Sequence, residues 1–117
     1  MKSRNRITGN LAENEACEVL KRKGFKILKR NFRNRFGEID IIAKDDDITV
    51  FVEVKAKTGT FLGSPEEMVD KRKLSKIRNM AQAYLNGLSV PCRIDVVAVV
   101  FSTENTIERL THYENVY

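Results

Sequence analysis

Hydrophobic and polar residues alternate most clearly along residues 37–57, and this pattern predicts a β-hairpin. Two arms rich in Ile and Val flank a polar segment at 44–47, as expected for two strands joined by a turn. Because successive side chains of a strand point to opposite faces, one hairpin face is predicted to be apolar and to pack on helices. That face comprises Ile39, Ile41, Ala43, Ile48, Val50, Val52, Val54 and Ala56.

The opposite face of the hairpin is apolar near the turn and charged at its open end. It comprises Glu38, Asp40, Ile42, Thr49, Phe51, Glu53, Lys55 and Lys57. A register that keeps the two apolar faces together also keeps Asp40, Glu53 and Lys55 together, because a slip of one residue would reverse one arm. The pattern therefore predicts two carboxylates and an ammonium group gathered on one sheet face.

Two helices are predicted outside the hairpin. Residues 9–23 carry apolar positions at helical spacing, with Thr8 or Asn10 as the N-cap and Gly24 at the end. A second helix is predicted from Ser64–Pro65 to about residue 86, because Pro is favoured in the first turn of a helix.

Three further strands complete the predicted sheet. Residues 25–31 form a short strand, residues 94–102 form an almost wholly apolar strand buried on both faces, and residues 107–114 form a short edge strand. Residues 58–63 predict a flexible loop with the character of a lid. The chain is thus predicted to be a single α/β domain, residues 1–117, in the order α-β-β-β-α-β with a short final strand.

The composition agrees with one cytoplasmic domain. The 117 residues suffice for one hydrophobic core but not for two domains of ordinary size. There is no apolar run of the length of a membrane span or a signal peptide, which predicts a protein with no membrane partner. Cys17, Cys92 and the single His112 do not form a usual structural zinc site, so we expect two buried, reduced thiols.

Basic residues cluster near the N-terminus and in the second predicted helix. Residues 1–35 contain eleven Lys or Arg against three Glu, and a second group occupies residues 71–78. Clustered cations bind the phosphate backbone of nucleic acids with little sequence preference, although a solvated basic surface has the same composition. The candidate nucleic-acid contacts are Arg33, Arg35, Lys57, Lys71 and Lys73.

The predicted cluster of Asp40, Glu53 and Lys55 suits metal-assisted hydrolysis. Mg²⁺, or Mn²⁺ in its place, prefers oxygen ligands, which the two carboxylates and the backbone carbonyl of Val54 would supply. Such an ion would neutralise a phosphodiester and lower the pKa of a bound water, while Lys55 would orient that water or stabilise the transition state. The simpler alternative is a solvent-facing strand on which Lys55 only pairs with a carboxylate.

Other charged residues have two interpretations each. Glu13 lies beside the apolar stripe of the first helix, where it either reaches the metal or stays a solvent-facing charge. Lys71 stands three residues before Leu74, so it either faces inward to meet a phosphate or is exposed. Asp95, at the start of an apolar strand, is predicted to be a structural partner of Arg93 or of a helix cation rather than a metal ligand.

These segments, in this order, resemble a known family. Asp40 followed by Glu53-Val54-Lys55 is similar to the D…(D/E)-x-K core of the restriction-endonuclease-like nucleases. With residues 37–40, 51–55 and 93–97, nearly the whole chain resembles the small bacterial YraN-like proteins. That uncharacterised family is similar in fold to archaeal Holliday-junction resolvases.

The resemblance carries expectations about fold, site and partners. It implies a restriction-endonuclease-like fold with a central mixed sheet, a catalytic site of Asp40, Glu53 and Lys55, and Glu13 as a further ligand. Two residues depart from the family pattern: Ile39 stands where the superfamily name has Pro, and Ala12 where a Gly is expected.

The sequence therefore predicts a Mg²⁺-dependent nuclease that hydrolyses DNA phosphodiester bonds. A branched or structured substrate follows from the resemblance alone. The alternatives are a nucleic-acid-binding module that keeps the fold without robust catalysis, and an enzyme acting on nucleotides.

A homodimer is also predicted. One site cuts one strand, whereas a symmetric junction needs two cuts and a two-fold dimer supplies two sites. The interface candidates are exposed apolar residues, which could equally pack on the core or stack on unpaired bases: Phe32, Phe36, Phe61 and Leu62.

Overall fold

Five strands form one mixed sheet in the order β1-β2-β3-β4-β5 in the computed structural model, which describes residues 2–58 and 70–116. The strands are β1 (Lys26–Asn34), β2 (Gly37–Asp45), β3 (Ile48–Thr58), β4 (Cys92–Phe101) and β5 (Ile107–Tyr113). β3 and β4 are parallel, and the other neighbouring strands are antiparallel. The mixed sheet and the order of elements are as predicted.

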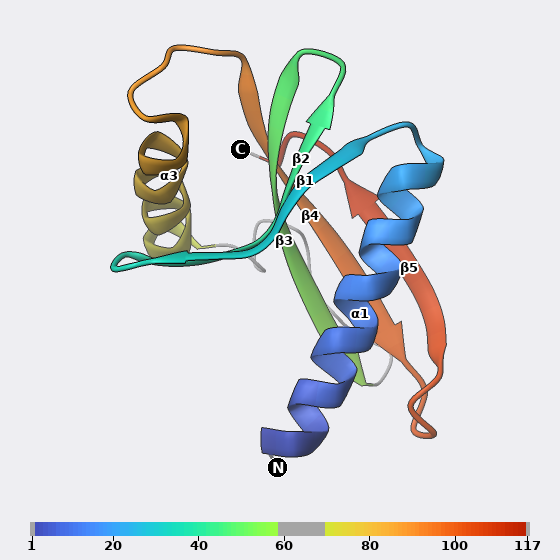
Figure 1. Ribbon diagram of the computed structural model, residues 1–117. Coiled ribbons are helices and arrows are strands. Elements are labelled where there is room, and N and C mark those ends of the chain that lie inside the picture. The colour runs from blue at the N-terminus through green and yellow to red at the C-terminus, as the bar shows by residue number, and fades with distance from the viewer. Residues whose placement is uncertain (1, 59–69, 117) are drawn as a thin grey trace.

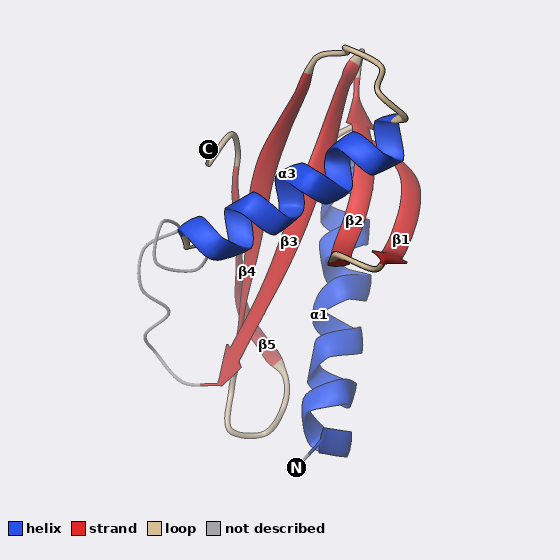
Figure 2. Ribbon diagram, turned by 90° about the vertical axis from the view of Figure 1, so that its left-hand side faces the viewer, coloured by secondary structure: helices blue, strands red, loops and turns tan. Residues whose placement is uncertain are grey.

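One helix covers each face of this sheet. α1 (Lys2–Arg22) and α3 (Lys71–Leu85) lie on opposite sides of it in Figure 1, and Figure 2 shows α3 crossing the face of β2, β3 and β4. The core beneath α1 contains Ala12, Ala16, Cys17, Leu20, Phe25, Ile41, Ala43, Val50, Val52, Val97, Val99 and Phe101. The core beneath α3 contains Ile39, Ile42, Phe51, Leu74, Ile77, Met80, Ala81, Ile94 and Val96.

The hairpin of β2 and β3 has the predicted register near its turn. Ile41 pairs with Val52 and Ala43 with Val50, so these apolar residues share the α1 face, while Phe51 belongs to the α3 face. At the open end, the predicted alternation holds at Val54 of β3, which packs on the core beneath α1, but it is wrong in β2. Ile39 was expected to share a face with Ile41, but it lies in the core beneath α3.

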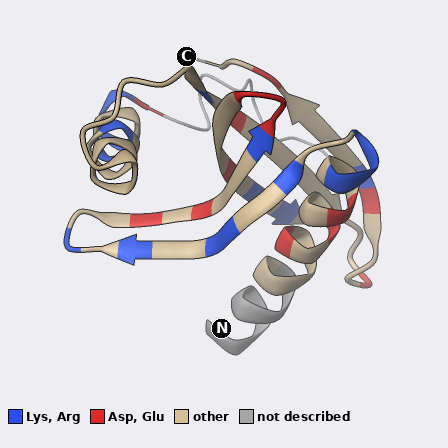
Figure 3. Ribbon diagram, turned by 45° about the horizontal axis from the view of Figure 1, so that its top comes forward, with Lys and Arg blue, Asp and Glu red and all other residues tan. Residues whose placement is uncertain are grey.

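A kink in the β1–β2 pair explains this difference. Asn31 and Asp40 are not paired, although Arg30–Ile41 and Phe32–Ile39 on either side of them are. Asn31 also has a left-handed φ of 53°. The β2–β3 ladder ends at Ile41 and Val52, whereas β1 and β2 stay paired as far as Asn34 and Gly37. Residues 31–40 therefore leave the sheet as a two-stranded ribbon arm, which Figure 3 shows extending away from β3.

Both helices differ from their predicted bounds. α1 begins at Lys2 rather than residue 9, so neither Thr8 nor Asn10 caps it, although it ends before Gly24 as predicted. α3 begins at Lys71, because Asp70 is an extended N-cap whose carboxylate accepts a hydrogen bond from Lys73 N at 2.9 Å. The predicted start at Ser64–Pro65 and the loop after Thr58 lie outside the described residues.

The remaining strands follow the prediction more closely. β4 is buried along nearly its whole length, β5 forms the edge, and β1 continues three residues beyond its predicted end at residue 31. Both cysteines are free, but only Cys17 is buried; Cys92 is exposed, which corrects the expectation of two buried thiols. Neither described helix is long and apolar enough to cross a membrane.

Candidate active site

Asp40 and Glu53 meet in the fork where the ribbon arm separates from β3. The Asp40 carboxylate accepts a hydrogen bond of 2.7 Å from Val54 N, the N–H next in line beyond the end of the β2–β3 ladder. Since the N–H and C=O of a strand residue point to the same side, the Val54 carbonyl also faces the fork. Glu53 is adjacent in sequence and only 5% exposed. The fork thus collects the three oxygen groups predicted as metal ligands.

Glu53 and burial together perturb the carboxyl group of Asp40. The pKa of Asp40 is raised from 3.8 to about 7, first by burial and then by repulsion from Glu53 and a hydrogen bond between the two carboxyls, against which the hydrogen bond from Val54 N acts to lower it. Two carboxylates this close cannot both ionise freely. Near neutral pH Asp40 therefore holds a proton more readily than an ordinary aspartate does, and a bound cation would displace that proton.

Two lysines neutralise Glu53, and one of them was not predicted in this role. Lys55 Nζ lies 3.5 Å from Glu53 Oε2, and Lys73 Nζ, from the first turn of α3, lies 3.0 Å from the same atom. Partial burial acts to lower the pKa of Lys73, but the attraction and hydrogen bond of Glu53 outweigh it, so this pKa is raised. Lys73 was predicted only as a contact to nucleic acid.

Glu13 approaches the fork but is held by other partners. It lines a cleft of about 210 Å³ together with Asp40, Val54 and residues of the ribbon arm. Its Oε1 accepts hydrogen bonds from Arg30 Nε at 3.1 Å and from Asn31 Nδ2 at 2.9 Å. Glu13 therefore stands beside the candidate metal ligands and ties α1 to the kink, and it is not a solvent-facing charge, because it is 8% exposed.

The donor set in the fork fits a hard cation with an incomplete protein shell. Within residues 2–58 and 70–116, no three His, Cys, Asp or Glu side chains group closely enough to hold a metal by themselves. Two carboxylates and a carbonyl match the way Mg²⁺ is commonly bound, with water and substrate phosphate completing the shell. Asp40, Glu53 and the Val54 carbonyl are the residues that would hold such an ion.

The other predicted contacts to nucleic acid lie on the surface, and one of them, Arg33, lines the cleft. Arg33 lines the cleft and pairs with Glu38 at 3.0 Å, and Arg35 lies at the tip of the ribbon arm. Lys57 and Lys71 are exposed, so Lys71 does not face inward as one interpretation of the sequence required. Figure 3 shows Lys and Arg along β1 and the arm tip, and acidic residues on β2 facing them.

A second polar cluster was recognised in the sequence only through its Asp95–Arg93 pair. Asp95 is fully buried and accepts hydrogen bonds from Arg93 Nε at 3.0 Å and from Asn115 N at 2.8 Å. His112 Nε2 lies 2.7 Å from Asp95, and Lys23 Nζ lies 2.7 Å from His112 Nδ1. Asp95 is a partner of Arg93, as predicted. The cluster joins β4, β5 and the end of α1 and belongs to the framework of the fold.

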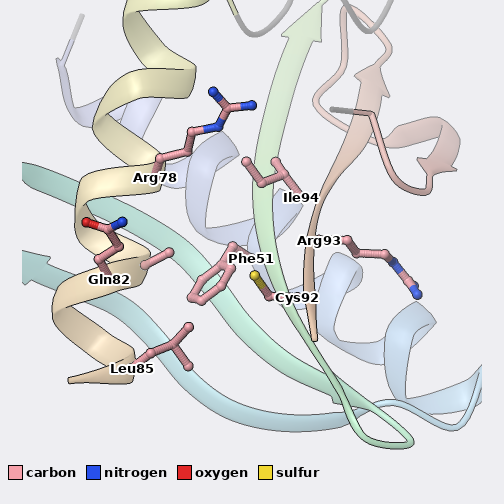
Figure 4. Close-up of a pocket in the computed structure, with 8 residues that line it drawn as sticks. Phe51, Arg78, Gln82, Leu85, Cys92, Arg93 and Ile94 are labelled. Carbon is pink, nitrogen blue, oxygen red and sulfur yellow. The ribbon is translucent and has the colours of Figure 1, made fainter. Parts of the chain in front are cut away.

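A cavity of about 290 Å³ between α3 and the start of β4 lacks the chemistry of the fork. Phe51, Leu85 and Ile94 form its apolar wall, and Arg78 and Gln82 reach it from α3 (Figure 4). No carboxylate lines it, so it offers no site for a hard cation. In the described residues, the fork is therefore the better candidate for metal-dependent chemistry.

The perturbed pKa of Asp40 predicts a pH-dependent cost in stability. Because the pKa is raised on folding, the folded protein binds more protons than the unfolded chain between pH 3.8 and about 7. The free energy of unfolding therefore decreases as pH rises through that window. Asp40→Asn keeps an acceptor for Val54 N and removes the repulsion. We expect the variant to be more stable than wild type by roughly 1–2 kcal/mol at pH 8 in EDTA, and by less at pH 4.

Urea unfolding at the two pH values measures this difference. Asp47→Asn, the same change at an exposed position in the turn of the hairpin, is the matched control and should have no such pH dependence. A variant less stable than wild type at pH 8 would show that the Asp40 charge supports the fold instead of straining it.

Comparison with known proteins finds one family. A model described as uncharacterised protein family UPF0102 matches residues 12–99. A UPF0102 protein of Pelotomaculum thermopropionicum is 39% identical over 120 residues, covering 100% of both chains. One from Persephonella marina is 45% identical over 97 residues (80% of this chain, 84% of the relative), and one from Thermotoga petrophila is 42% identical over 108 residues (91% and 93%). Their names state no activity.

Proposed function

This chain belongs to the uncharacterised protein family UPF0102, as its resemblance to the YraN-like proteins indicated, and we propose that it is a metal-dependent nuclease acting on DNA. One observation carries the proposal. The half-buried carboxyl group of Asp40, whose pKa is raised to about 7, lines an open cleft and lies against the buried carboxyl group of Glu53. Lys55 and Lys73 lie within 3.5 Å of Glu53. Perturbed acids of this kind are concentrated at functional sites because the fold gains no stability from them.

Each residue of the fork has a role in the proposed hydrolysis. Asp40, Glu53 and the Val54 carbonyl would hold a divalent cation, which would supply a nucleophilic water and a Lewis acid for the phosphodiester. Asp40 would bind it as the carboxylate, without the proton that its raised pKa favours. Lys55 and Lys73, both within 3.5 Å of Glu53, provide fixed positive charge where charge develops on the phosphate.

The substrate is branched or otherwise structured DNA, and the working form is a homodimer. Lys and Arg follow β1 to the tip of the ribbon arm (Figure 3), which suits a phosphate backbone, and they would give affinity without sequence preference. A dimer with two-fold symmetry brings two forks to the two strands of a symmetric junction.

A second candidate is a nucleic-acid-binding module without robust catalysis. It is favoured by the ion pairs of the fork, because Lys73 and Lys55 already neutralise Glu53, and Arg30 already neutralises Glu13. Such a site is electrostatically complete without a cation. The two candidates differ in one respect: added metal should start DNA cleavage in a nuclease but not in a binding module.

Cleavage of labelled linear, flapped and four-way DNA in Mg²⁺ or Mn²⁺ tests the proposed function. We expect cuts near the branch point in the flapped and four-way substrates, a much slower reaction on linear duplex, and no reaction in EDTA. Equal rates on all three substrates would contradict the proposed preference. Binding without cleavage in either metal would favour the second candidate.

Replacing an exposed lysine at the start of α3 should weaken DNA binding without regard to sequence. Lys71→Ala removes a candidate phosphate contact, so the slope of log K against log salt should decrease by roughly 0.9. Lys44→Ala, at the opposite end of the hairpin among acidic residues, is the matched control and should leave the slope unchanged. Fluorescence anisotropy over a range of salt concentrations measures both slopes. An unchanged slope in Lys71→Ala would place the DNA path elsewhere.

A further inference from the structure

The tip of the ribbon arm presents an aromatic side chain to solvent. Arg35 and Phe36 form the two-residue turn between Asn34 and Gly37, which are paired across the ribbon. Asn34 Oδ1 accepts a hydrogen bond of 2.8 Å from Phe36 N, and Gly37 has a φ of +146° that few other residues adopt. The turn is thus built to hold one conformation, with Phe36 41% exposed.

Phe36 has no part in the hydrophobic core. The other ribbon phenylalanine, Phe32, packs edge-on against Tyr84 of α3 with ring centroids 5.4 Å apart. Phe36 instead lies beneath the guanidinium group of Arg35, which is 5.1 Å from the ring centroid. Phe32 therefore fixes the arm to the domain, whereas Phe36 belongs to neither core cluster and keeps part of its ring exposed to solvent.

The position of Phe36 relates it to the fork. It precedes Asp40 by four residues along the same arm, a span of about 13 Å at the rise of an extended strand. Bases along one strand are about 3.4 Å apart, so this span corresponds to roughly four nucleotides. Arg33, in the opposite strand of the arm, lines the cleft that contains Asp40. A DNA strand that follows the arm from the fork therefore reaches the tip.

We propose that Arg35 and Phe36 form a stacking site for an unpaired base at a DNA branch point. An aromatic ring and a guanidinium group are the side chains on which unpaired bases stack, and the flanking cations hold the phosphates. A base inside a duplex already stacks on both neighbours and must be unstacked at a cost, whereas a base at a branch has a free face. The tip therefore selects branched DNA. This inference rests on the proposed DNA substrate but not on hydrolysis.

A tryptophan probe tests the stacking site directly, because the chain contains no tryptophan. Phe36→Trp keeps the aromatic face, and its emission can be followed in EDTA, where no cleavage occurs. We expect a four-way junction to quench this emission strongly, and a covalently closed circular duplex, which lacks ends and branches, to leave it nearly unchanged. Leu88→Trp is the control, because Leu88 is 67% exposed in the turn after α3.

A second variant separates stacking from simple apolar contact. Phe36→Leu stays apolar but cannot stack, so binding to the junction should weaken about tenfold while binding to the closed duplex is unchanged. The inference is overturned if junction DNA at saturation leaves the emission of Phe36→Trp unchanged. It is also overturned if Phe36→Leu weakens binding to the junction and to the closed duplex equally. Either result, together with intact cleavage by wild type, leaves the proposed nuclease function standing. Quenching without any cleavage supports the stacking site within a binding module.

Discussion

Asp40→Asn should reduce the rate of DNA cleavage by about a thousandfold while leaving DNA affinity nearly unchanged. The substitution removes one of the two carboxylates that would bind the cation, so the cation would lose one of its two negatively charged ligands. The metal contributes several kcal/mol of transition-state stabilisation, and each 1.36 kcal/mol corresponds to a factor of ten in rate. In the proposed function, DNA affinity would come from the exposed cations, which this substitution does not touch.

Single-turnover rates and anisotropy on the same protein samples separate the two effects. Lys55→Ala should also abolish cleavage with little loss of affinity, because Lys55 acts on the reacting groups of the fork. Asp47→Asn, at the other end of the same hairpin, should cut DNA at the wild-type rate. If every variant lost binding and cleavage in equal proportion, the assignment of separate roles to the fork and the basic surface would be wrong.

Asp95→Asn should destabilise the protein by roughly 3 kcal/mol or more. Asp95 is fully buried and holds Arg93, His112 and the backbone of Asn115. Burial alone would raise the pKa of Asp95, but these hydrogen bonds hold it below its usual value. Removing one partner of a buried ion pair leaves the other charges uncompensated, which costs about 3–5 kcal/mol.

Urea unfolding at pH 7 measures this loss, with Asp47→Asn again as the control, expected within about 0.5 kcal/mol of wild type. Because the pKa of Asp95 is lowered on folding, its contribution is present above the ordinary value and is lost as pH falls below about 4. The gap between wild type and Asp95→Asn should narrow accordingly at acidic pH. An equally large difference in the free energy of unfolding at pH 3 would mean that packing, and not the charge of Asp95, stabilises the wild type.

The regular parts of the fold could be predicted from local patterns. Strict alternation identified the hairpin and its register, because the buried strand residues at 41–43 and 50–52 obey the two-face rule. The prediction failed at the kink, where Asn31 adopts a left-handed conformation and Ile39 lies on the opposite face from the one predicted. Asn tolerates that conformation, but it also occupies many regular positions, so its presence alone does not predict a kink.

The candidate site was predicted in part for the same reason. Asp40, Glu53 and Lys55 lie on one hairpin, so the sequence indicated that they are close, but Asp40 reaches Glu53 from the kinked arm and not through the predicted alternation. Lys73 and Glu13 reach the fork from separate helices, and their exact partners depend on how those helices pack. The Asp95–His112 pair joins β4 to β5 and gave no local signal beyond a buried acid beside an arginine.

The central claim is that the fork hydrolyses DNA, and a paired single-turnover assay tests it most directly. Wild type and Glu53→Gln, purified in parallel, are mixed in excess with a 5′-labelled four-way junction in Mg²⁺, and the labelled products are resolved over time. We expect wild type to cut near the branch in Mg²⁺ but not in EDTA, and Glu53→Gln to bind the junction yet cut it at least about a thousandfold more slowly. Equal cutting by both proteins, or binding without cutting by wild type in Mg²⁺ and in Mn²⁺, would contradict it.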